Sequence, residues 1–247
     1  MAKKTLQIEP FQILTFPFQD EHWIKKIIIT SLMFLFSFIP VVPLVLLLGY
    51  AGEIIRGVAV DEEPPALPEW DDLGSYFNSG IRLFGVGLIY LIPSVLFFGI
   101  GYLAIMAPVF LTDIGIFLDI EGMVIFAVFY LMGFGLMGVG ALVSLLTGLI
   151  LPVAGAHAAV TSDFQAAFKF KEIWALIKAN WGGFVVSFLI LLGAAVVLYY
   201  GAYFLAATII LCCLYPFAVS FMSAYLLLIG AGFFGNAYRI SVLNLPS

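Results

Sequence analysis

The sequence predicts an all-α fold, a polytopic transmembrane helix bundle, on three observations. Hydrophobic residues make up 64% of the 247 residues and charged residues only 10%, whereas an ordinary globular domain carries about 25% charged residues. Five apolar stretches are each longer than the ~20 residues that cross the hydrocarbon core. They lack the alternation of apolar and polar residues that is typical of barrel strands, so we expect them to be helices, in which every backbone N–H and C=O is hydrogen-bonded within the segment. We expect residues 1–247 to form a single integral membrane domain.

The five apolar stretches are separated by three polar segments and one tight break. They cover residues 24–48, 83–107, 122–151, 181–206 and 208–235. The two cysteines, Cys212 and Cys213, are adjacent within the last stretch. We interpret them as small buried hydrophobes, because free cysteine is among the most buried residue types.

The first apolar stretch carries Pro40 and Pro43 near its middle. Each proline removes a backbone N–H and clashes with the preceding turn. The stretch is therefore predicted to be a proline-broken hairpin that enters and leaves on one side, which makes four full spans. The alternative is a kinked helix that crosses completely, which makes five full spans.

The distribution of basic residues favours the hairpin. None of the ten Lys and Arg residues lies in 83–168, where the connecting loop carries Asp113, Asp119 and Glu121. With a hairpin all ten fall on one side, whereas five full spans divide them four to six. Basic residues gather on the cytoplasmic side, so we expect both termini there. The three loop carboxylates are interpreted as solvated, and cation binding by them stays an open alternative.

Three segments are expected to lie at the membrane interface, namely 9–18, 61–82 and 162–180. In the second, an acidic, proline-rich run is expected to be extended, and Asp71 and Asp72 favour a helix N-terminus after it. In the third, Ser162 and Gln165 suggest a capping box. Five apolar residues then share one helical face, with lysines elsewhere, as in a helix lying in the headgroup plane. They are Ala166, Phe170, Ile173, Trp174 and Ile177.

No pattern in the sequence predicts catalysis, a cofactor or a metal. G-x-S-x-G, H-E-x-x-H and Walker patterns do not occur, and His22 and His157 stand far apart. No stretch has an ionisable residue near its centre, where a pump or ion transporter would need one, and no basic stripe suits nucleic acid. We therefore expect a non-enzymatic accessory or scaffold subunit that packs with other membrane proteins, or with itself, or organises lipid. The alternative is a small transporter or permeation protein for a lipophilic or neutral solute.

Two sets of residues are predicted to make contacts. The first set, near the ends of apolar stretches, would dock a partner or a lipid headgroup: Arg56, Trp70, Asp71, Asp72, Arg82 and Arg239. The alternative role for the arginines is to snorkel to phosphates and fix topology. The second set, Gly140, Ser144 and Gly148, repeats every fourth residue and would allow close helix packing.

Four short motifs resemble one known family. FPFQDEHWIKKI, GYAGEIIRGV, LPEWDD and the terminal NAYR occur in that order and are similar to domain-of-unknown-function family 4013, an uncharacterised family of prokaryotic multi-pass membrane proteins. The resemblance implies a bacterial or archaeal cytoplasmic membrane. It implies no activity and no catalytic residue, but it draws attention to Trp23, Gly49, Arg56, Trp70, Asp71, Arg82 and Arg239.

Overall fold

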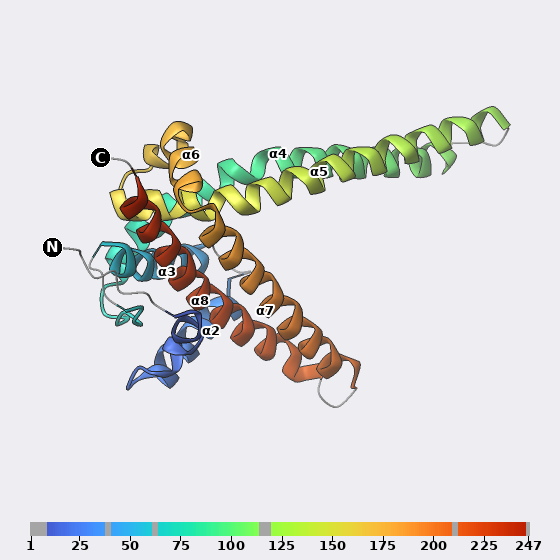
Figure 1. Ribbon diagram of the computed structural model, residues 1–247. Coiled ribbons are helices and arrows are strands. Elements are labelled where there is room, and N and C mark those ends of the chain that lie inside the picture. Colours follow the sequence, from blue (N-terminus) through green and yellow to red (C-terminus); the bar gives the residue numbers. More distant parts are fainter. Residues whose placement is uncertain (1–8, 38–40, 61–63, 114–119, 209–211, 246–247) are drawn as a thin grey trace. The chain divides into compact units, whose positions relative to one another are not determined.

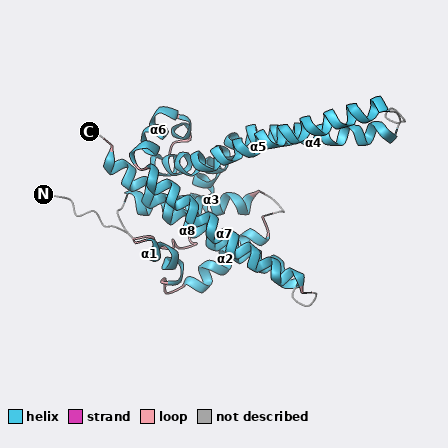
Figure 2. Ribbon diagram, turned by 45° about the vertical axis from the view of Figure 1, so that its right-hand side comes forward, coloured by secondary structure: helices cyan, strands magenta, loops and turns pink. Residues whose placement is uncertain are grey.

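The computed structural model describes residues 9–37, 41–60, 64–113, 120–208 and 212–245, and every regular element in them is helical (Figures 1 and 2). The chain divides into two compact units. The first unit is Met1–Val86 with Pro152–Ser247, and the second unit is Gly87–Leu151. The all-α prediction is confirmed for the described residues.

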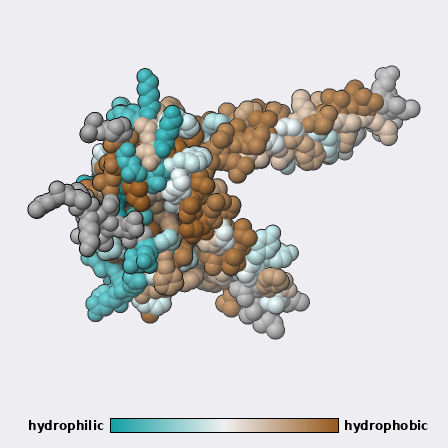
Figure 3. Space-filling model, viewed as in Figure 1, coloured by the Kyte–Doolittle hydropathy of each residue, from teal (hydrophilic) through white to brown (hydrophobic). Residues whose placement is uncertain are grey.

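Five of the described helices are long and apolar enough to cross a membrane. The qualifying segments are Val42–Val60, Leu73–Phe110, Gly122–Thr161, Trp181–Phe204 and Tyr215–Asn244. Large apolar side chains stay exposed along them, as Leu131 (77%) and Phe204 (73%) illustrate. Figure 3 shows mostly apolar colouring along α4 and α5, and hydrophilic colouring both around α6 and at the lower left of the view. A surface of that kind is suited to lipid or to other membrane helices.

Helix α8 (Tyr215–Asn244) is the centre of the first unit. It packs against α2 (Trp23–Leu35), α3 (Val42–Val60), α6 (Phe170–Ala179) and α7 (Trp181–Ala207). The short α1 (Pro10–Thr15) and the 3-10 turn η1 (Phe16–Phe18) also pack on it. Small residues allow this density, because a Cβ atom on Gly235 would lie 3.2 Å from the backbone of Ile55 in α3.

The first apolar stretch is broken near its prolines, as predicted. α2 ends at Leu35, α3 begins at Val42, and Pro43 takes the second position of α3. Pro40 lies outside the described residues. The 13 residues of α2 reach only about 20 Å at 1.5 Å per residue, too short to cross alone. Entry and return of this stretch on one side stays a prediction.

The first turns of α4 (Leu73–Asp113) cross α3 at two glycines. A Cβ on Gly49 would overlap the carbonyl of Tyr76, and one on Gly80 would overlap the carbonyl of Val45. No larger residue fits at either place without moving a backbone. Gly49 and Gly80 therefore allow α3 and α4 to approach closely, and this approach positions the site described below.

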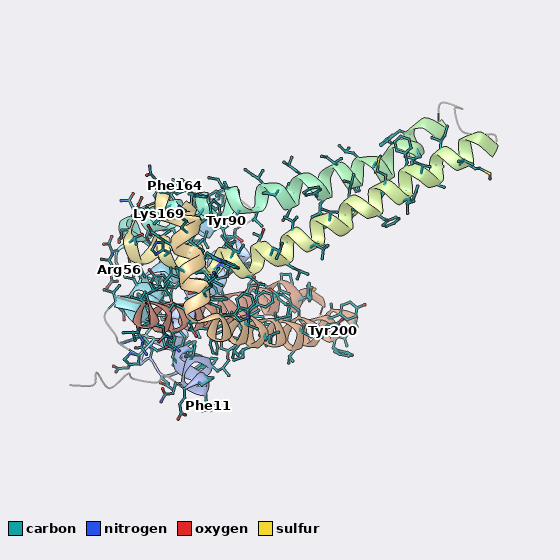
Figure 4. The ribbon with its side chains drawn as sticks, turned by 45° about the horizontal axis from the view of Figure 1, so that its top comes forward. Phe11, Arg56, Tyr90, Phe164, Lys169 and Tyr200 are labelled. Atoms are coloured by element: carbon teal, nitrogen blue, oxygen red, sulfur yellow. The ribbon has the colours of Figure 1, made fainter. Side chains whose placement is uncertain are left out.

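The second unit is a pair of helices, formed by α4 and α5 (Ile120–Thr161), which run side by side in Figures 1 and 4. The two helices approach closely at Gly101 and Gly133, where a Cβ on either would lie within 3 Å of the other's carbonyl oxygen. Of the predicted packing set, Gly140 lies against Phe97 and Phe98, since an added Cβ would stand 3.2 Å from the former.

Ser144 and Gly148 of the predicted packing set are half-buried, and their part in packing stays a prediction. Cation binding by the predicted acidic loop also stays untested. Asp119 lies outside the described residues, and nothing is described of the side chains of Asp113 and Glu121.

Two local predictions are wrong. Ser162 and Gln165 do not cap one continuous helix, because a 3-10 turn (Gln165–Phe168) comes first and α6 begins only at Phe170. Cys213 is exposed rather than buried, since the chain turns between α7 and α8 at the 3-10 segment Cys212–Leu214. Helix α8 continues past the apolar stretch 208–235 and ends at Asn244.

Candidate functional site

The LPEWDD motif is fastened to three helices through consecutive backbone carbonyls. Side chains of α2, α3 and α4 donate one hydrogen bond each. The pairs are Lys26 Nζ with Leu67 O (2.8 Å), Tyr50 Oη with Pro68 O (2.8 Å), and Tyr76 Oη with Glu69 O. We call residues 67–69 the strap. The strap belongs to no helix, but each of its three carbonyls has a hydrogen-bond donor, and these bonds hold it in place.

Lys26 is the most buried charged group of this region, with a side chain only 4% exposed. Its ammonium lies 2.8 Å from Asp20 Oδ2 and 2.6 Å from Glu69 Oε1. With the strap carbonyl, the three N–H donors therefore have three oxygen partners. Burial alone would raise the pKa of Asp20, but hydrogen bonds from Lys26 and from the His22 N–H, with the lysine charge, bring it below its ordinary value.

An aromatic stack supports the strap. The rings of Tyr50 and Trp70 are parallel with centroids 4.2 Å apart, and Tyr76 meets both edge-on at 5.6 Å. The two tyrosine hydroxyls are the strap donors, so stacking and hydrogen bonding fix the same residues. Trp70 is thus placed in the packing beside the strap.

A polar cavity of about 380 Å³ lies beside this strap, within the first unit. It is lined by the last turns of α3, the first turns of α4 and the last turn of α5. Four charged residues contribute to the wall: Glu53, Arg56, Asp72 and Arg82. Neutral polar groups, including Ser75, Asn78 and Ser162, line it as well. Cavities of this size are within the range that holds small ligands.

The two arginines bind the same turn of the chain. Ser162 follows α5 with φ of +54°, the one non-glycine residue of the described chain with positive φ. Arg82 Nη1 donates to its carbonyl, and Arg56 Nη1 donates to its hydroxyl at a long 3.5 Å. A serine in this strained conformation persists only where its surroundings hold it. Both guanidinium groups therefore remain at the cavity wall.

The charged groups of the cavity do not neutralise one another by contact. In the described part of the chain neither arginine makes an ion pair, and Glu53 makes neither an ion pair nor a hydrogen bond. Asp72 accepts one bond, at 3.0 Å from the Ser75 N–H, which caps α4. The predicted placement of Asp72 at a helix N-terminus is confirmed. Two cationic and two anionic groups thus face one cavity.

A family model described as a protein of unknown function, DUF4013, matches residues 32–207. The chain belongs to the DUF4013 family. No curated protein and no solved structure matches it. The matched range contains every residue that lines the cavity, together with the strap. Lys26 and all of α8 lie outside it. The cavity therefore lies in the segment that the DUF4013 model matches. Lys26, which binds the strap, precedes that segment in the sequence.

The structure brings together only part of the predicted docking set in this DUF4013 chain. Arg56, Asp72 and Arg82 line the cavity. Asp71, which precedes Asp72 in the sequence, is exposed and does not line it. Arg239 is buried within α8 at 5% exposure, and its guanidinium donates to Asn236 Oδ1 at 3.3 Å. Glu53 completes the charged residues of the cavity wall.

Sequence reasoning missed a second polar cluster of the DUF4013 chain, around His157. This side chain, near the end of α5, lies 2.8 Å from Tyr238 Oη through Nδ1 and 3.1 Å from Glu172 Oε2 through Nε2. It joins α5, α6 and α8, because each partner comes from a different helix. Within the described residues no group of three His, Cys, Asp or Glu side chains could hold a metal ion.

Helix α6 presents a mixed aromatic and basic surface. Ile173, Leu176 and Ile177 are buried, but Phe170 (64%) and Trp174 (54%) are exposed. Of the predicted apolar face, the rest of the chain therefore covers the isoleucines and leaves these two aromatics exposed, and its position in the headgroup plane stays a prediction. The exposed side also carries Lys169, Lys171 and Lys178, with the last ammonium 5.5 Å from the Trp174 ring centre. Figure 4 places Lys169 and Arg56 at the same end of the first unit, away from Tyr200.

Proposed function

We propose that this chain is a non-enzymatic multi-pass protein of a prokaryotic cytoplasmic membrane, an accessory or scaffold subunit that organises lipid at one bilayer face. The observation behind this proposal is the exposed surface of α6, where Phe170 and Trp174 stand among three lysines. Tryptophan rings prefer the membrane–water interface. Lysines near an anionic leaflet add about 1 kcal/mol each to the attraction.

The packing of α6 supports the same function. Its buried side already rests on α8 and α7, so the exposed aromatics are not needed for the fold of this chain. An amphipathic helix with one face on the bundle and aromatics with lysines on the other is suited to the headgroup layer. The long exposed apolar helices supply surface for a second copy or for other membrane proteins.

The alternative function, transport of a small neutral solute, has less support. A transporter binds its substrate near the middle of its spans. The polar cavity here is lined by end turns of α3, α4 and α5. That position suits a group at the surface of the bilayer.

The proposed orientation places both termini in the cytoplasm. All eight basic residues in the described part of the chain belong to the first unit, and none to Gly87–Leu151. Single cysteines at Ala66 and in the 112–119 loop, on a background in which Cys212 and Cys213 are replaced by serine, would be labelled from outside intact cells. Only the loop cysteine should react, and labelling at Ala66 would restore five full spans.

The lipid function is tested by extracting the protein with its surrounding membrane into polymer discs, followed by mass spectrometry of co-purifying lipids and proteins. Anionic lipid should be enriched around the wild type. The enrichment should fall when Lys171 and Lys178 are replaced by glutamine and Phe170 and Trp174 by alanine. Lys25, exposed on α2, gives the matched control K25Q. Equal lipid composition around all three proteins, with no partner recovered, would refute the proposed function.

A further inference from the structure

We propose that the polar cavity binds the headgroup of a zwitterionic aminophospholipid, a phosphate and a primary ammonium joined by two carbons. This inference deepens the lipid-organising function proposed above and rests on it. The cavity presents two guanidinium groups, from Arg56 and Arg82, and two carboxylates, from Glu53 and Asp72. Because no ion pair joins them in the described structure, both signs of charge are available to one ligand.

The cationic side of the cavity suits a phosphate. Arginine presents several N–H donors in a planar fork that matches phosphate oxygens. Arg82 uses Nε and Nη1 on the carbonyls of Asn78 and Ser162, and Arg56 makes one long bond to the Ser162 hydroxyl. The remaining donors of both side chains are free of partners in the described structure. Two such groups from different helices would hold a phosphate between α3 and α4.

The anionic side selects the second half of the ligand. A lone anion would satisfy the arginines but would leave the Glu53 and Asp72 carboxylates without a counter-charge. A primary ammonium carries three N–H donors and would bond both carboxylates. A quaternary ammonium has no donor and is typically bound by aromatic rings, and no aromatic side chain is among the residues lining the cavity. The chemistry therefore favours an ethanolamine headgroup over choline or an acidic headgroup.

The position of the cavity supports a lipid as the source. Its walls are the ends of helices long and apolar enough to cross a membrane. Ser162, at its edge, leads within eight residues into α6 with its exposed Phe170 and Trp174. A headgroup in the cavity would place its acyl chains beside apolar helix surface. A free water-soluble phosphoethanolamine compound shares the charges but gains nothing from that surface.

The decisive measurement compares the purified protein's binding of phosphatidylethanolamine and phosphatidylcholine by native mass spectrometry. Both lipids are neutral overall, so the lysines of α6 do not distinguish them. Wild type should bind the ethanolamine lipid about tenfold more tightly, as expected for charge-assisted hydrogen bonds. The double substitution Glu53→Gln with Asp72→Asn should abolish this preference. Asparagine retains the side-chain oxygen that caps α4, so the fold should be kept.

Two further variants complete the test. Asp71→Asn removes a neighbouring exposed carboxylate that does not line the cavity, and it should leave the preference unchanged. Arg56→Gln, whose only bond is the long one to Ser162, should weaken binding of both lipids, because both carry a phosphate.

Three results would overturn the proposal: no preference in the wild type, a preference that survives the double substitution, or glycerophosphoethanolamine binding as tightly as the lipid. The last result would assign the site to a soluble compound instead. Each is distinguishable from failure of the proposed function, which is measured by anionic lipid around α6 and not by the ethanolamine preference.

Discussion

Replacing the buried Lys26 with methionine should destabilise the first unit far more than replacing an exposed lysine would. Methionine keeps most of the length of the side chain but removes the charge and all three donors. The Leu67 carbonyl, whose residue is 4% exposed, would lose its partner, at a cost of about 1–3 kcal/mol. Loss of the ion pairs adds less, because the side chain of Glu69 is 55% exposed and solvent screens it. We expect a total loss of about 2–4 kcal/mol in the free energy of unfolding.

The assay is thermal unfolding in detergent, followed by intrinsic tryptophan fluorescence, which Trp70 beside the strap should report directly. A loss of that size corresponds to a fall in Tm of roughly 4–16 °C for a chain of this length. Lys25→Met is the matched control, because Lys25 is exposed and surface substitutions usually change stability by less than about 0.5 kcal/mol. Equal Tm values for the two variants would refute the assignment of Lys26 as the anchor of the strap.

Three other predictions concern separate parts of the chain. Gly133→Leu should destabilise the α4–α5 pair, measured as lost monodisperse protein, whereas Gly135→Leu should not, because open space surrounds Gly135. Asp20 has a lowered pKa in the folded chain, so the stability that its carboxylate contributes is present above the ordinary pKa of 3.8 and is lost as pH falls through the folded pKa. The difference in stability between wild type and Asp20→Asn should therefore shrink on acidification, and a constant difference would contradict this. Tyr238→Phe should cost about 1 kcal/mol by removing the bond to His157, and unchanged Tm would argue against that bond.

The spans were predictable because hydropathy is a local property of the sequence. The fourth apolar stretch, 181–206, differs from α7 by one residue, and the prolines correctly predicted the break between α2 and α3. The α6 segment shows where local reasoning fails. A period of 3.6 residues places Phe170, Trp174 and the two isoleucines on one side of α6, but it does not say how far the rest of the chain covers that side. Only the isoleucines are buried, because that depends on how α7 and α8 pack against α6.

The candidate site was only partly predictable, because its contacts join distant positions. Arg56, Asp72 and Arg82 could be selected from their places at the ends of apolar stretches. Nothing periodic connects Lys26 to a carbonyl 41 residues later, or His157 to Tyr238 81 residues later. Glu53 lies one helical turn before Arg56 in the sequence, but only the three-dimensional structure shows that its carboxylate makes no ion pair with a described residue.

The strap has a consequence for how this chain can vary. Connections between helices usually accept insertions and deletions, because few contacts depend on their length. Here three donors from three helices meet three successive carbonyls, and one added residue would displace at least one carbonyl from its donor. Residues 67–69 are therefore a poor place for an inserted tag or reporter domain. In natural variants we expect the number of residues in this connection to be kept more strictly than their identity.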